Sequence, residues 1–426
     1  MPERVIYVVR SWPRLSQTFV VGEILALERQ GVELAVFAMV RSGEELVQPA
    51  VAQVRAPVVY LQDRTRLRGA ARLWPWLEVA REAPWRFLST VAWAIAHPGL
   101  AAGYGDAGVR ECLGDAVLIA RAVSRRRACG ERIGHVHAHF AHDPALVGLL
   151  TSRLTGLGFT FTAHARDLLQ IPASSLVARA RHARAVVTCC EANADYIRAT
   201  VPPESLPALE VVHHGVDLGR FAPRPPVAAD DAAGRPLITT VGRLVAKKGF
   251  DDLLRALALL AGRGAGFTCR VYGDGPLRDE LTRLRDDLGL GDRVELVGAR
   301  SGDEVVAALG RTDVFALTPR VTDDGDRDGI PNVLVEAMAC ALPVVTTDVG
   351  GVPELVDDGA NGLVVPSGSP ERVADALAAL LASAELRRRL GAAARRRVED
   401  DYDVDAAAGR LRALYGLAPA AERVPS

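Results

Sequence analysis

The stretch from Leu237 to Gly249 reads Leu-Ile-Thr-Thr-Val-Gly-Arg-Leu-Val-Ala-Lys-Lys-Gly. Its first five residues form a short β-rich run, and an amphipathic helical pattern over 251–261 follows the final glycine. Further short β-rich runs alternate with helical patterns (277–288 and 303–309) through the second half of the chain, at 269–272, 294–297, 314–317, 344–346 and 363–365. Such alternation is typical of a parallel sheet covered by helices on both faces. We therefore predict an α/β domain here.

The first half of the chain alternates in the same way, with less regular spacing. A strand-like run over 4–10 precedes a helical stretch over 18–30 and a second strand-like run over 32–39. More apolar runs follow at 58–61, 135–140, 159–163, 185–189 and 209–212. Residues 221–236 contain four prolines and break all periodicity, which is typical of a linker. A chain of 426 residues is longer than one hydrophobic core ordinarily supports, so we expect two domains. We divide the chain into a first domain at 1–221, a linker at 222–236, a second domain at 237–400, and a C-terminal helix and tail at 401–426.

The composition narrows the class of protein. Apolar residues make up 49% of the chain, and the net charge of −1 argues against a dedicated nucleic-acid binder. The six cysteines form no CxxC pair, which fits reduced thiols in a cytoplasm. The apolar run that begins at Val5 is too short for a signal-peptide core, and no apolar run reaches the roughly 20 residues of a membrane span. We therefore expect a cytoplasmic protein.

The chain has only two lysines, Lys247 and Lys248, and they are adjacent. A compact ammonium on a flexible stem suits a site that binds phosphate oxygens beside a bidentate arginine. Arg243 lies five residues before Lys248, just after the strand-like run. We predict a diphosphate clamp made by Arg243 and Lys248, with Lys247 a solvated neighbour. The alternative is that both lysines belong to a solvated turn.

A second candidate site lies at the start of a predicted helix, in the stretch from Asp328 to Ala339. Pro331 suits the first turn of a helix, and the unsatisfied amides of 330–333 would form an anion site. Asp328 and Glu336 are eight residues apart, so both carboxylates could face one ligand and accept hydrogen bonds from sugar or ribose hydroxyls. The alternative is that Asp328 caps the helix while Glu336 is solvated.

Five short motifs follow one another along the second half: Gly242-Arg243-Leu244 with Lys248-Gly249, Gly273-Asp274-Gly275-Pro276, Asp328 followed by Glu336, Gly350-Gly351-Val352-Pro353-Glu354, and Asn361-Gly362. Together they resemble the nucleotide-binding domain of the large retaining glycosyltransferase group 1 family (family four). Asp328 stands where that family more often has Glu. The resemblance implies the α/β GT-B fold, in which two Rossmann-like domains face each other across a cleft.

The first half resembles, more narrowly, bacterial transferases of exopolysaccharide clusters of the colanic-acid type. The stretches that carry this likeness are Pro13-Arg14-Leu15-Ser16-Gln17-Thr18-Phe19, Glu23-Ile24, His137-Ala138-His139-Phe140 and Phe161-Thr162-Ala163-His164-Ala165-Arg166-Asp167. Relatives in antibiotic and glycolipid pathways share these elements. The resemblance implies that 1–221 binds the acceptor, that 237–400 binds the nucleotide sugar, and that the C-terminal helix crosses back to the first domain.

The resemblance also implies a reaction and residue roles. The donor would be a UDP- or GDP-linked sugar, and the acceptor a saccharide, a lipid-linked molecule or a small natural product. Arg243 and Lys248 would neutralise the departing diphosphate, Asp328 would bind the donor sugar, Glu336 the ribose, and His164 would reach the donor sugar from the first domain. Arg300 is a further candidate for the base pocket. The other expected donor-binding residues are Gly242, Gly273, Asp274, Gly275, Pro276, Gly329, Ile330, Pro331, Asn332 and Val333. The expected acceptor or phosphate loop comprises Ser16, Gln17, Thr18, His139 and Asp167.

The same resemblance implies front-face substitution with retention, in which the departing phosphate takes the acceptor proton. Neither a cofactor nor a metal is then required. A rival hypothesis is a metal-dependent hydrolase, because alternate positions of a strand share a face and His135, His137 and His139, followed by His142 and Asp143, could bind zinc. The chain could also be a GT-B sugar epimerase or phosphorylase, or a pure nucleotide-sugar-binding module. No GxGxxG follows the first strand, so a dinucleotide oxidoreductase is disfavoured.

Four of the five tryptophans fall between Trp74 and Trp93, in an arginine-containing stretch over 64–97. Tryptophan with arginine on an amphipathic segment suits a membrane interface. The alternative is a helical lid whose indoles pack inward. If 64–97 contacts a bilayer, we expect peripheral attachment at the inner face of the membrane.

Overall fold

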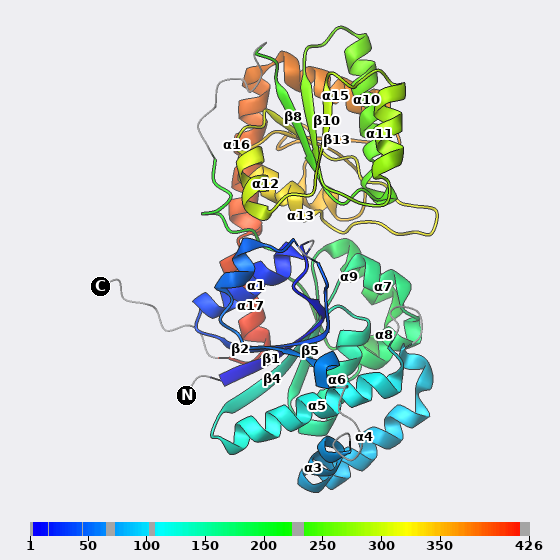
Figure 1. Cartoon of the computed structure of the whole chain (residues 1–426), viewed down its shortest axis with the longest axis vertical. Helices are drawn as coiled ribbons and strands as arrows, with labels where there is room; N and C mark the ends of the chain where they lie inside the picture. The colour runs from blue at the N-terminus through cyan, green and yellow to red at the C-terminus, as the bar shows by residue number, and fades with distance from the viewer. Residues whose placement is uncertain are drawn as a thin grey trace, which may run out of the picture. The chain divides into compact units, whose positions relative to one another are not determined.

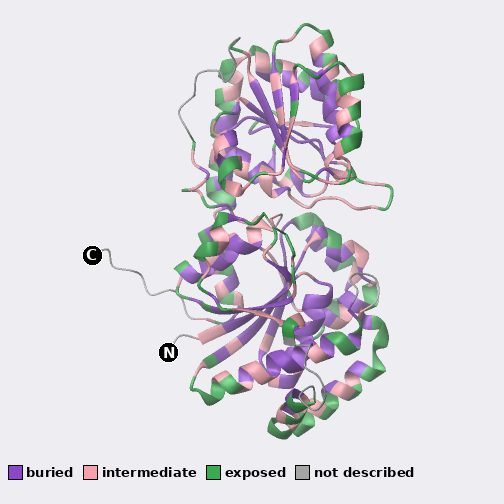
Figure 2. Ribbon diagram, in the orientation of Figure 1, coloured by how far each residue is buried: buried purple, intermediate pink, exposed green. Residues whose placement is uncertain are grey.

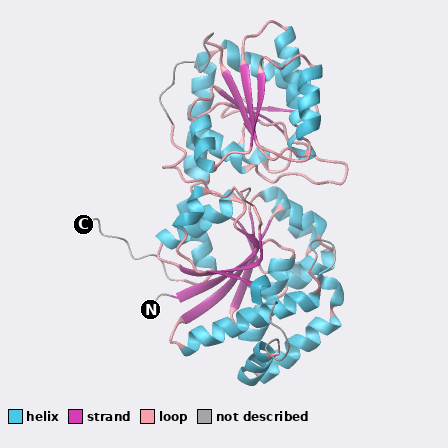
Figure 3. Cartoon of the chain, in the orientation of Figure 1, coloured by secondary structure: helices cyan, strands magenta, loops and turns pink. Residues whose placement is uncertain are grey.

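The computed structural model describes residues 3–15, 17–44, 46–64, 73–101, 107–223 and 234–417. The chain divides into two compact units. Unit 1 comprises Met1–His213 with Asp405–Ser426, and unit 2 comprises His214–Val404. Each unit contains one parallel sheet with helices packed on it (Figures 1 and 3). The prediction of two α/β domains with parallel sheets is confirmed.

The sheet of unit 1 has seven parallel strands in the order β3-β2-β1-β4-β5-β6-β7. The strands are β1 (Glu3–Trp12), β2 (Glu33–Arg41), β3 (Val58–Tyr60), β4 (Arg132–His139), β5 (Gly158–Ala163), β6 (Ala185–Thr188) and β7 (Ala208–Val211). In the centre of the sheet, Tyr7 of β1 pairs with Val36 of β2 on one side and with His137 of β4 on the other. The strand order reverses between β1 and β4. In open parallel sheets such a reversal is where loops at the carboxyl ends of the strands bind ligands.

The α-helices described for unit 1 surround this sheet. They are α1 (Thr18–Arg29), α2 (Leu61–Arg64), α3 (Trp74–Glu82), α4 (Pro84–Ala96), α5 (Val109–Ala128), α6 (Asp143–Thr155), α7 (Ala165–Gln170), α8 (Ala173–Ala180), α9 (Glu191–Thr200) and α17 (Val404–Leu414). Successive residues of β4 contact neighbours on opposite faces of the sheet. Val136 belongs to the apolar core with α5 and α6, whereas the ring of His137 contacts that of Tyr415, just after α17. Arg29 of α1 forms an ion pair of 2.8 Å with Asp405, so α17 packs in unit 1.

Unit 2 has six parallel strands in the order β10-β9-β8-β11-β12-β13, with the same reversal, here between β8 and β11. The strands are β8 (Leu237–Val241), β9 (Thr268–Tyr272), β10 (Val294–Gly298), β11 (Val314–Ala316), β12 (Val344–Thr347) and β13 (Leu363–Val365). The helices are α10 (Phe250–Gly262), α11 (Arg278–Asp287), α12 (Gly302–Leu309), α13 (Asn332–Ala339), α14 (Val352–Leu355), α15 (Pro370–Ala382) and α16 (Ala384–Asp401).

The two faces of this second sheet carry separate apolar cores. Val314 joins the core of α10, α11 and α15, whereas its neighbour Phe315 joins the core of α12, α13 and α16. This alternation is the period-two pattern expected of a strand covered on both faces. The central strands are accordingly buried in both units (Figure 2).

The boundary between the units lies earlier than residue 221, where the sequence placed it. Val216 donates a backbone hydrogen bond of 2.8 Å to the carbonyl of Tyr402, and Phe221 belongs to the α12–α13–α16 core. The segment from His214 onward therefore packs with unit 2. Of the expected linker at 222–236, residues 224–233 lie outside the described residues.

Candidate functional site

The loops that follow β8 and β9 are joined by backbone hydrogen bonds. Gly242 donates to the carbonyl of Tyr272 at 2.9 Å, and Leu244 donates to that of Asp274 at 3.0 Å. Gly273 has a φ of +141°, and a β-carbon there would lie 1.9 Å from the carbonyl oxygen of Gly242. The close approach of these backbones therefore requires glycine at 273. The structure brings together the predicted donor-binding residues of both loops: Gly242, Gly273, Asp274, Gly275 and Pro276.

The lysine loop is attached to the segment that follows β11. A short 3₁₀ turn over Ala246–Lys248 ends at Gly249, whose φ is +63°. A β-carbon on Gly249 would lie 1.9 Å from the carbonyl oxygen of Thr318, and the Thr318 hydroxyl donates to the carbonyl of Gly249 at 2.7 Å. Arg320 adds a hydrogen bond of 3.0 Å from Nε to the carbonyl of Ala246. These contacts hold the lysines where the strand order reverses.

Both lysines are ion-paired with carboxylates from the loop before α13. Lys248 Nζ lies 2.6 Å from Asp328 Oδ2, and Lys247 Nζ lies 3.4 Å from Asp328 Oδ1. Lys247 also contacts Asp326 at 3.0 Å. The side chains of these four residues are all largely shielded from solvent. The expectation that Lys247 is a solvated neighbour is therefore wrong, because its ammonium links two carboxylates.

The lysines determine the charge state of Asp328. Burial alone raises the pKa of this carboxyl group, but the charges of Lys248 and then Lys247 outweigh burial, so its pKa lies below the ordinary value. Asp328 is thus an ionised acceptor at neutral pH. A carboxylate of this kind can accept hydrogen bonds from hydroxyls of a ligand, while each ammonium has three donors to share between Asp328 and that ligand.

Asp328 is held in place by a glycine turn and precedes the start of α13. A β-carbon on Gly350 would lie 2.1 Å from the carbonyl oxygen of Asp328, and Gly351 donates to the carbonyl of Gly329 at 3.0 Å. The helix begins at Asn332, so Pro331 is its N-cap residue and not, as the sequence suggested, part of the first turn.

The first turn of α13 contains no acidic residue and has no side-chain cap. Amides at such a helix start attract an anion. Glu336 lies on the second turn and is half-buried. The other predicted residues of this helix start are also half-buried apart from Pro331, which is buried: Gly329, Ile330, Asn332 and Val333.

The two arginines predicted for the site differ. Arg243 is exposed, and among the described residues it forms no ion pair. Arg300 lies 3.5 Å from Glu304 and also donates to the carbonyl of Ala299. Arg243 is therefore the more available cation for an anionic ligand.

In unit 1, the predicted residues gather at the carboxyl ends of β4 and β5. The rings of His139 and His164 stack with centroids 5.1 Å apart and planes at 18°. Phe19 lies 5.2 Å and Phe140 4.8 Å from the His164 ring. Asp167 accepts a hydrogen bond of 3.1 Å from the His164 backbone amide, and its Oδ1 lies 3.6 Å from His164 Nδ1. His139, His164 and Asp167 therefore form one cluster.

The environment of His164 keeps its ring neutral. Burial lowers the pKa of His164, and the hydrogen bond and charge of Asp167 offset only part of that shift. A neutral imidazole has one donor and one acceptor nitrogen and can therefore exchange hydrogen bonds with a hydroxyl group. Of the predicted loop, Gln17 is the N-cap residue of α1 and Thr18 its first residue, directly before Phe19. Ser16 lies outside the described residues.

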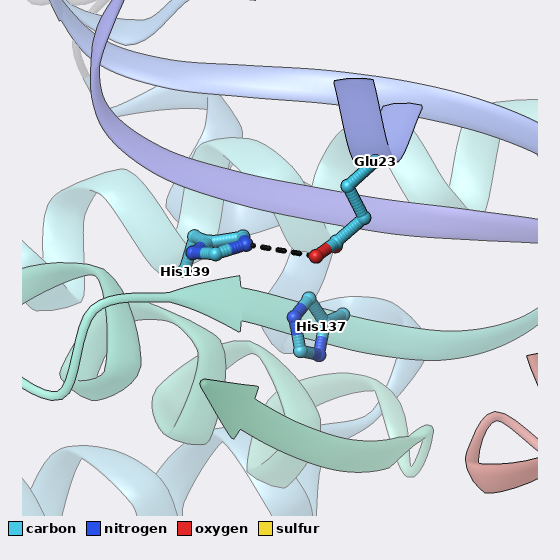
Figure 4. A group of neighbouring side chains, drawn as sticks. All are labelled: Glu23, His137 and His139. Atoms are coloured by element: carbon cyan, nitrogen blue, oxygen red, sulfur yellow. Dashed lines mark hydrogen bonds and ion pairs between the residues drawn. The ribbon is translucent and has the colours of Figure 1, made fainter. Parts of the chain in front are cut away.

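A second histidine cluster lies deeper in unit 1. Glu23 Oε2 lies 3.2 Å from His139 Nε2 (Figure 4). The Tyr7 hydroxyl donates to Glu23 Oε1 at 2.6 Å. Glu23, His137 and His139 each offer a ligand atom within 4.8 Å of the others, so this trio could hold a metal ion. The zinc hypothesis did not include Glu23. The sequence signal for Glu23 was its place in the Glu23-Ile24 element, one helical turn after Phe19 on α1.

The surroundings of this trio favour a hydrogen-bonded network over a hydrolytic metal centre. His137 is bonded through both nitrogens, to the Thr160 hydroxyl at 2.9 Å and to the Thr162 hydroxyl at 3.2 Å. Burial lowers the pKa of His137 far below its ordinary value. A catalytic zinc keeps an open coordination position for water. Glu23, His137 and His139 are all buried and offer no such position to solvent.

Sequence reasoning missed Asp326 and Arg320, which hold the lysine loop. Arg320 Nη1 contacts Asp251 at 3.0 Å at the start of α10, and its backbone amide donates to the carbonyl of Lys247. The available signal was the run Asp323-Asp324-Gly325-Asp326-Arg327-Asp328, because clustered carboxylates attract nearby cations.

Two family models match parts of the chain. Residues 228–397 match the family model of glycosyl transferases group 1, and residues 105–220 match that of Glycosyltransferase Family 4. The chain is 36% identical over 210 residues to a GDP-mannose-dependent α-(1-6)-phosphatidylinositol monomannoside mannosyltransferase of Mycobacterium tuberculosis. The aligned region covers 48% of the chain and 54% of that protein. It is 41% identical over 182 residues to the putative colanic acid biosynthesis glycosyltransferase WcaL of Salmonella typhimurium, with 42% of each chain covered. The chain thus spans about half the length of the curated relatives that it matches.

A solved structure extends the likeness of fold to nearly the whole chain. The structure of Anabaena Alr3699/HepE in complex with UDP superposes with a TM-score of 0.70. The superposition covers 97% of this chain and 99% of that protein, at 17% sequence identity. At that identity the likeness concerns the fold.

Proposed function

Because this chain belongs to the glycosyl transferases group 1 family and has the GT-B fold, we propose that it transfers a hexosyl group from a nucleoside-diphosphate sugar to an acceptor hydroxyl. The observation that carries the proposal is the pairing of Lys248 with Asp328 where the strand order of unit 2 reverses. A cation and a carboxylate side by side match a donor that joins a diphosphate to a polyhydroxylated sugar.

The diphosphate is bound by cations and amides. Arg243 is exposed and Lys248 has donors beyond its bond to Asp328, so both can meet phosphate oxygens. The amides at the start of α13 add a neutral source of positive potential. Negative charge grows on the leaving diphosphate as its bond to the sugar breaks, and preorganised positive charge there lowers the barrier.

The sugar and the nucleoside are held by carboxylates and glycine loops. Asp328 accepts hydrogen bonds from hydroxyls of the donor sugar, and Glu336 accepts them from the ribose. The loop from Gly273 to Pro276 and, less directly, Arg300 face the base. The neutral ring of His164 can exchange a hydrogen bond with a sugar hydroxyl.

The reaction proceeds with retention at the anomeric carbon and without a metal. The bond between that carbon and the diphosphate oxygen breaks, the acceptor oxygen bonds on the same face, and the acceptor proton passes to the departing phosphate. Asp328 is held by two ammonium groups, which lower the nucleophilicity of its carboxylate and disfavour a covalent sugar–enzyme intermediate. Lys248, Arg243 and the α13 amides supply the positive charge that a metal ion provides in other transferases.

The acceptor is a saccharide or a lipid-linked molecule, and the donor carries UDP or GDP. The names of the matched relatives support this range: one is GDP-mannose-dependent and acts on a phosphatidylinositol monomannoside, and another belongs to colanic acid biosynthesis. Residues of unit 1 around His139, Asp167, Gln17 and Thr18 select the acceptor.

A thermal-shift panel of UDP- and GDP-sugars tests the proposal, since a ligand that binds only the folded state raises Tm by mass action. We expect one sugar nucleotide to raise Tm more than its nucleoside diphosphate does, and Asp328→Asn to abolish that difference. Addition of an acceptor should then release nucleoside diphosphate, which separates a transferase from a pure binding module. A protein whose Tm responds to no sugar nucleotide would refute the proposal.

A further inference from the structure

Large apolar side chains are exposed together on two consecutive helices of unit 1. Trp85 is 82% and Ile95 is 73% exposed. We call the group on α3, α4 and the preceding residue the α3–α4 face, made up of Leu73, Trp74, Leu77, Trp85, Leu88 and Ile95. The other large apolar side chains exposed in the described residues are only four, at Leu46, Val47, Leu259 and Val321. Most of the exposed large apolar side chains in the described residues are therefore concentrated on the α3–α4 face.

Helix α4 is apolar on both of its sides. Trp85, Leu88 and Ile95 recur at spacings of three and seven residues, which places them on one side of the helix. On the other side, Thr90 and Ala94 are buried, and Phe87 and Val91 pack against the core of unit 1. An apolar side of a helix is normally covered, and the described residues cover only one of the two apolar sides of α4.

The four tryptophans divide into two pairs. Trp76 packs edge-on against Phe87 at 6.1 Å, and the Arg153 guanidinium lies 4.9 Å above the ring of Trp93. Inward packing thus accounts for Trp76 and Trp93. Trp74 and Trp85 point outward, and the indole nitrogen of Trp74 donates to Glu78 at 2.6 Å. A lid packed on its own core does not explain this outward pair.

The charges around the face are mostly positive. Between Ala83 and Ala101 the chain contains no carboxylate. Glu78 is neutralised by Arg121 and by Arg125 at 2.9 Å. With exposed Arg81 and Arg86, the described residues here contribute four arginines against two carboxylates, those of Glu78 and Glu82.

We propose that the α3–α4 face lies on the surface of an anionic bilayer. Exposed tryptophan and aliphatic side chains enter the boundary between headgroups and acyl chains, while arginines at the rim meet lipid phosphates. Among the described residues, every helix is too short or too polar for a membrane span, so the contact is a surface contact. A second copy of the chain is a poorer occupant, because a twofold interface would bring the same arginines together.

Flotation of the full-length protein with vesicles tests this proposal without any sugar donor, so the result does not depend on the transfer reaction. We expect flotation with phosphatidylcholine vesicles that contain phosphatidylglycerol, and little flotation with phosphatidylcholine alone or at high salt. Trp85→Ser combined with Ile95→Ser should weaken vesicle partitioning at least tenfold. Arg81→Glu with Arg86→Glu should remove the preference for phosphatidylglycerol.

Two exposed apolar residues of unit 2 provide the matched control. Leu259→Ser with Val321→Ser removes a similar amount of exposed apolar surface and should leave flotation unchanged. Circular dichroism and Tm verify that each variant is folded, as expected for exposed positions. The proposal is overturned if the wild-type protein does not float, or if the α3–α4 variant floats as well as the control. It is also overturned if sedimentation velocity shows a dimer that Trp85→Ser with Ile95→Ser dissociates.

Discussion

Replacement of Lys247 by methionine tests whether the network around Asp328 is as tightly coupled as the structure indicates. The change keeps the apolar stem and removes the ammonium that lies 3.0 Å from Asp326 and 3.4 Å from Asp328. A hydrogen bond to a charged group contributes about 1.5–3 kcal/mol, and partial exposure places this pair in the middle of that range. We therefore expect unit 2 to lose about 2 kcal/mol of stability, which lowers Tm by about 4–8 °C for a unit of this size.

The same change should also affect the reaction. With Lys247 removed, Lys248 alone neutralises Asp328 and has less freedom to meet the diphosphate. A loss of about 1.4 kcal/mol in transition-state binding corresponds to a tenfold fall in kcat/KM. Urea and thermal unfolding give the stability, and release of nucleoside diphosphate gives the kinetics.

A control and a double-mutant cycle complete the experiment. Arg263→Met removes one partner of an ion pair of 2.8 Å whose side chains are half exposed, so it should cost less than about 1 kcal/mol. Lys247→Met combined with Asp326→Asn should cost less than the sum of the single changes, by at least about 0.5 kcal/mol. If Lys247→Met matches the wild-type protein in Tm and kcat/KM, Lys247 is solvated and our reasoning about the network fails.

Three further predictions concern the turns and the buried carboxylates. Gly249→Ala places a β-carbon 1.9 Å from the Thr318 carbonyl oxygen at a φ of +63°, so we expect Tm to fall by several degrees and kcat to drop. Gly264→Ala is the control, because Gly264 has open space around it. Equal Tm values for the two variants would contradict the turn geometry. Glu23→Gln weakens the bonds from Tyr7 and His139, so urea unfolding should show a loss of about 1–3 kcal/mol, and unchanged stability would argue against the network. The folded-state pKa of Asp328 is lowered, so its stabilisation is present above the unfolded-state pKa of about 3.9 and is lost as pH falls through the folded-state pKa. Urea unfolding of wild-type protein and Asp328→Asn across this acidic range should therefore converge, and parallel pH profiles would refute the assignment.

The sequence predicted the elements of local origin well. The alternation around Leu237 and Val314 gave the parallel sheet of unit 2, because the period of apolar residues reports the strand directly. The glycines at 249 and 273 stand in short motifs of the sequence. The structure shows why glycine is needed there, because both backbones approach other chain segments too closely for a side chain.

The contacts that sequence reasoning missed join residues far apart in the chain. The pairing of Lys247 with Asp326 depends on where the β8 and β11 loops meet, which no local pattern records. The same limit applies to α4: its composition showed that it is apolar, but only the packing of Phe87 and Val91 distinguishes the covered side from the open side with Trp85. The start of unit 2 at His214 also follows from packing, through the bond between Val216 and Tyr402.

The turnover of Lys248→Ala tests most directly whether the pair with Asp328 binds the diphosphate sugar. At saturating donor and acceptor, we expect kcat for nucleoside-diphosphate release to fall by roughly 100- to 1,000-fold, the usual effect of removing one preorganised group that stabilises transition-state charge. The KM for the acceptor should change by less than about threefold, because Lys248 acts on the leaving group and not on the acceptor. A kcat within about threefold of the wild-type value would contradict the assignment of the donor site.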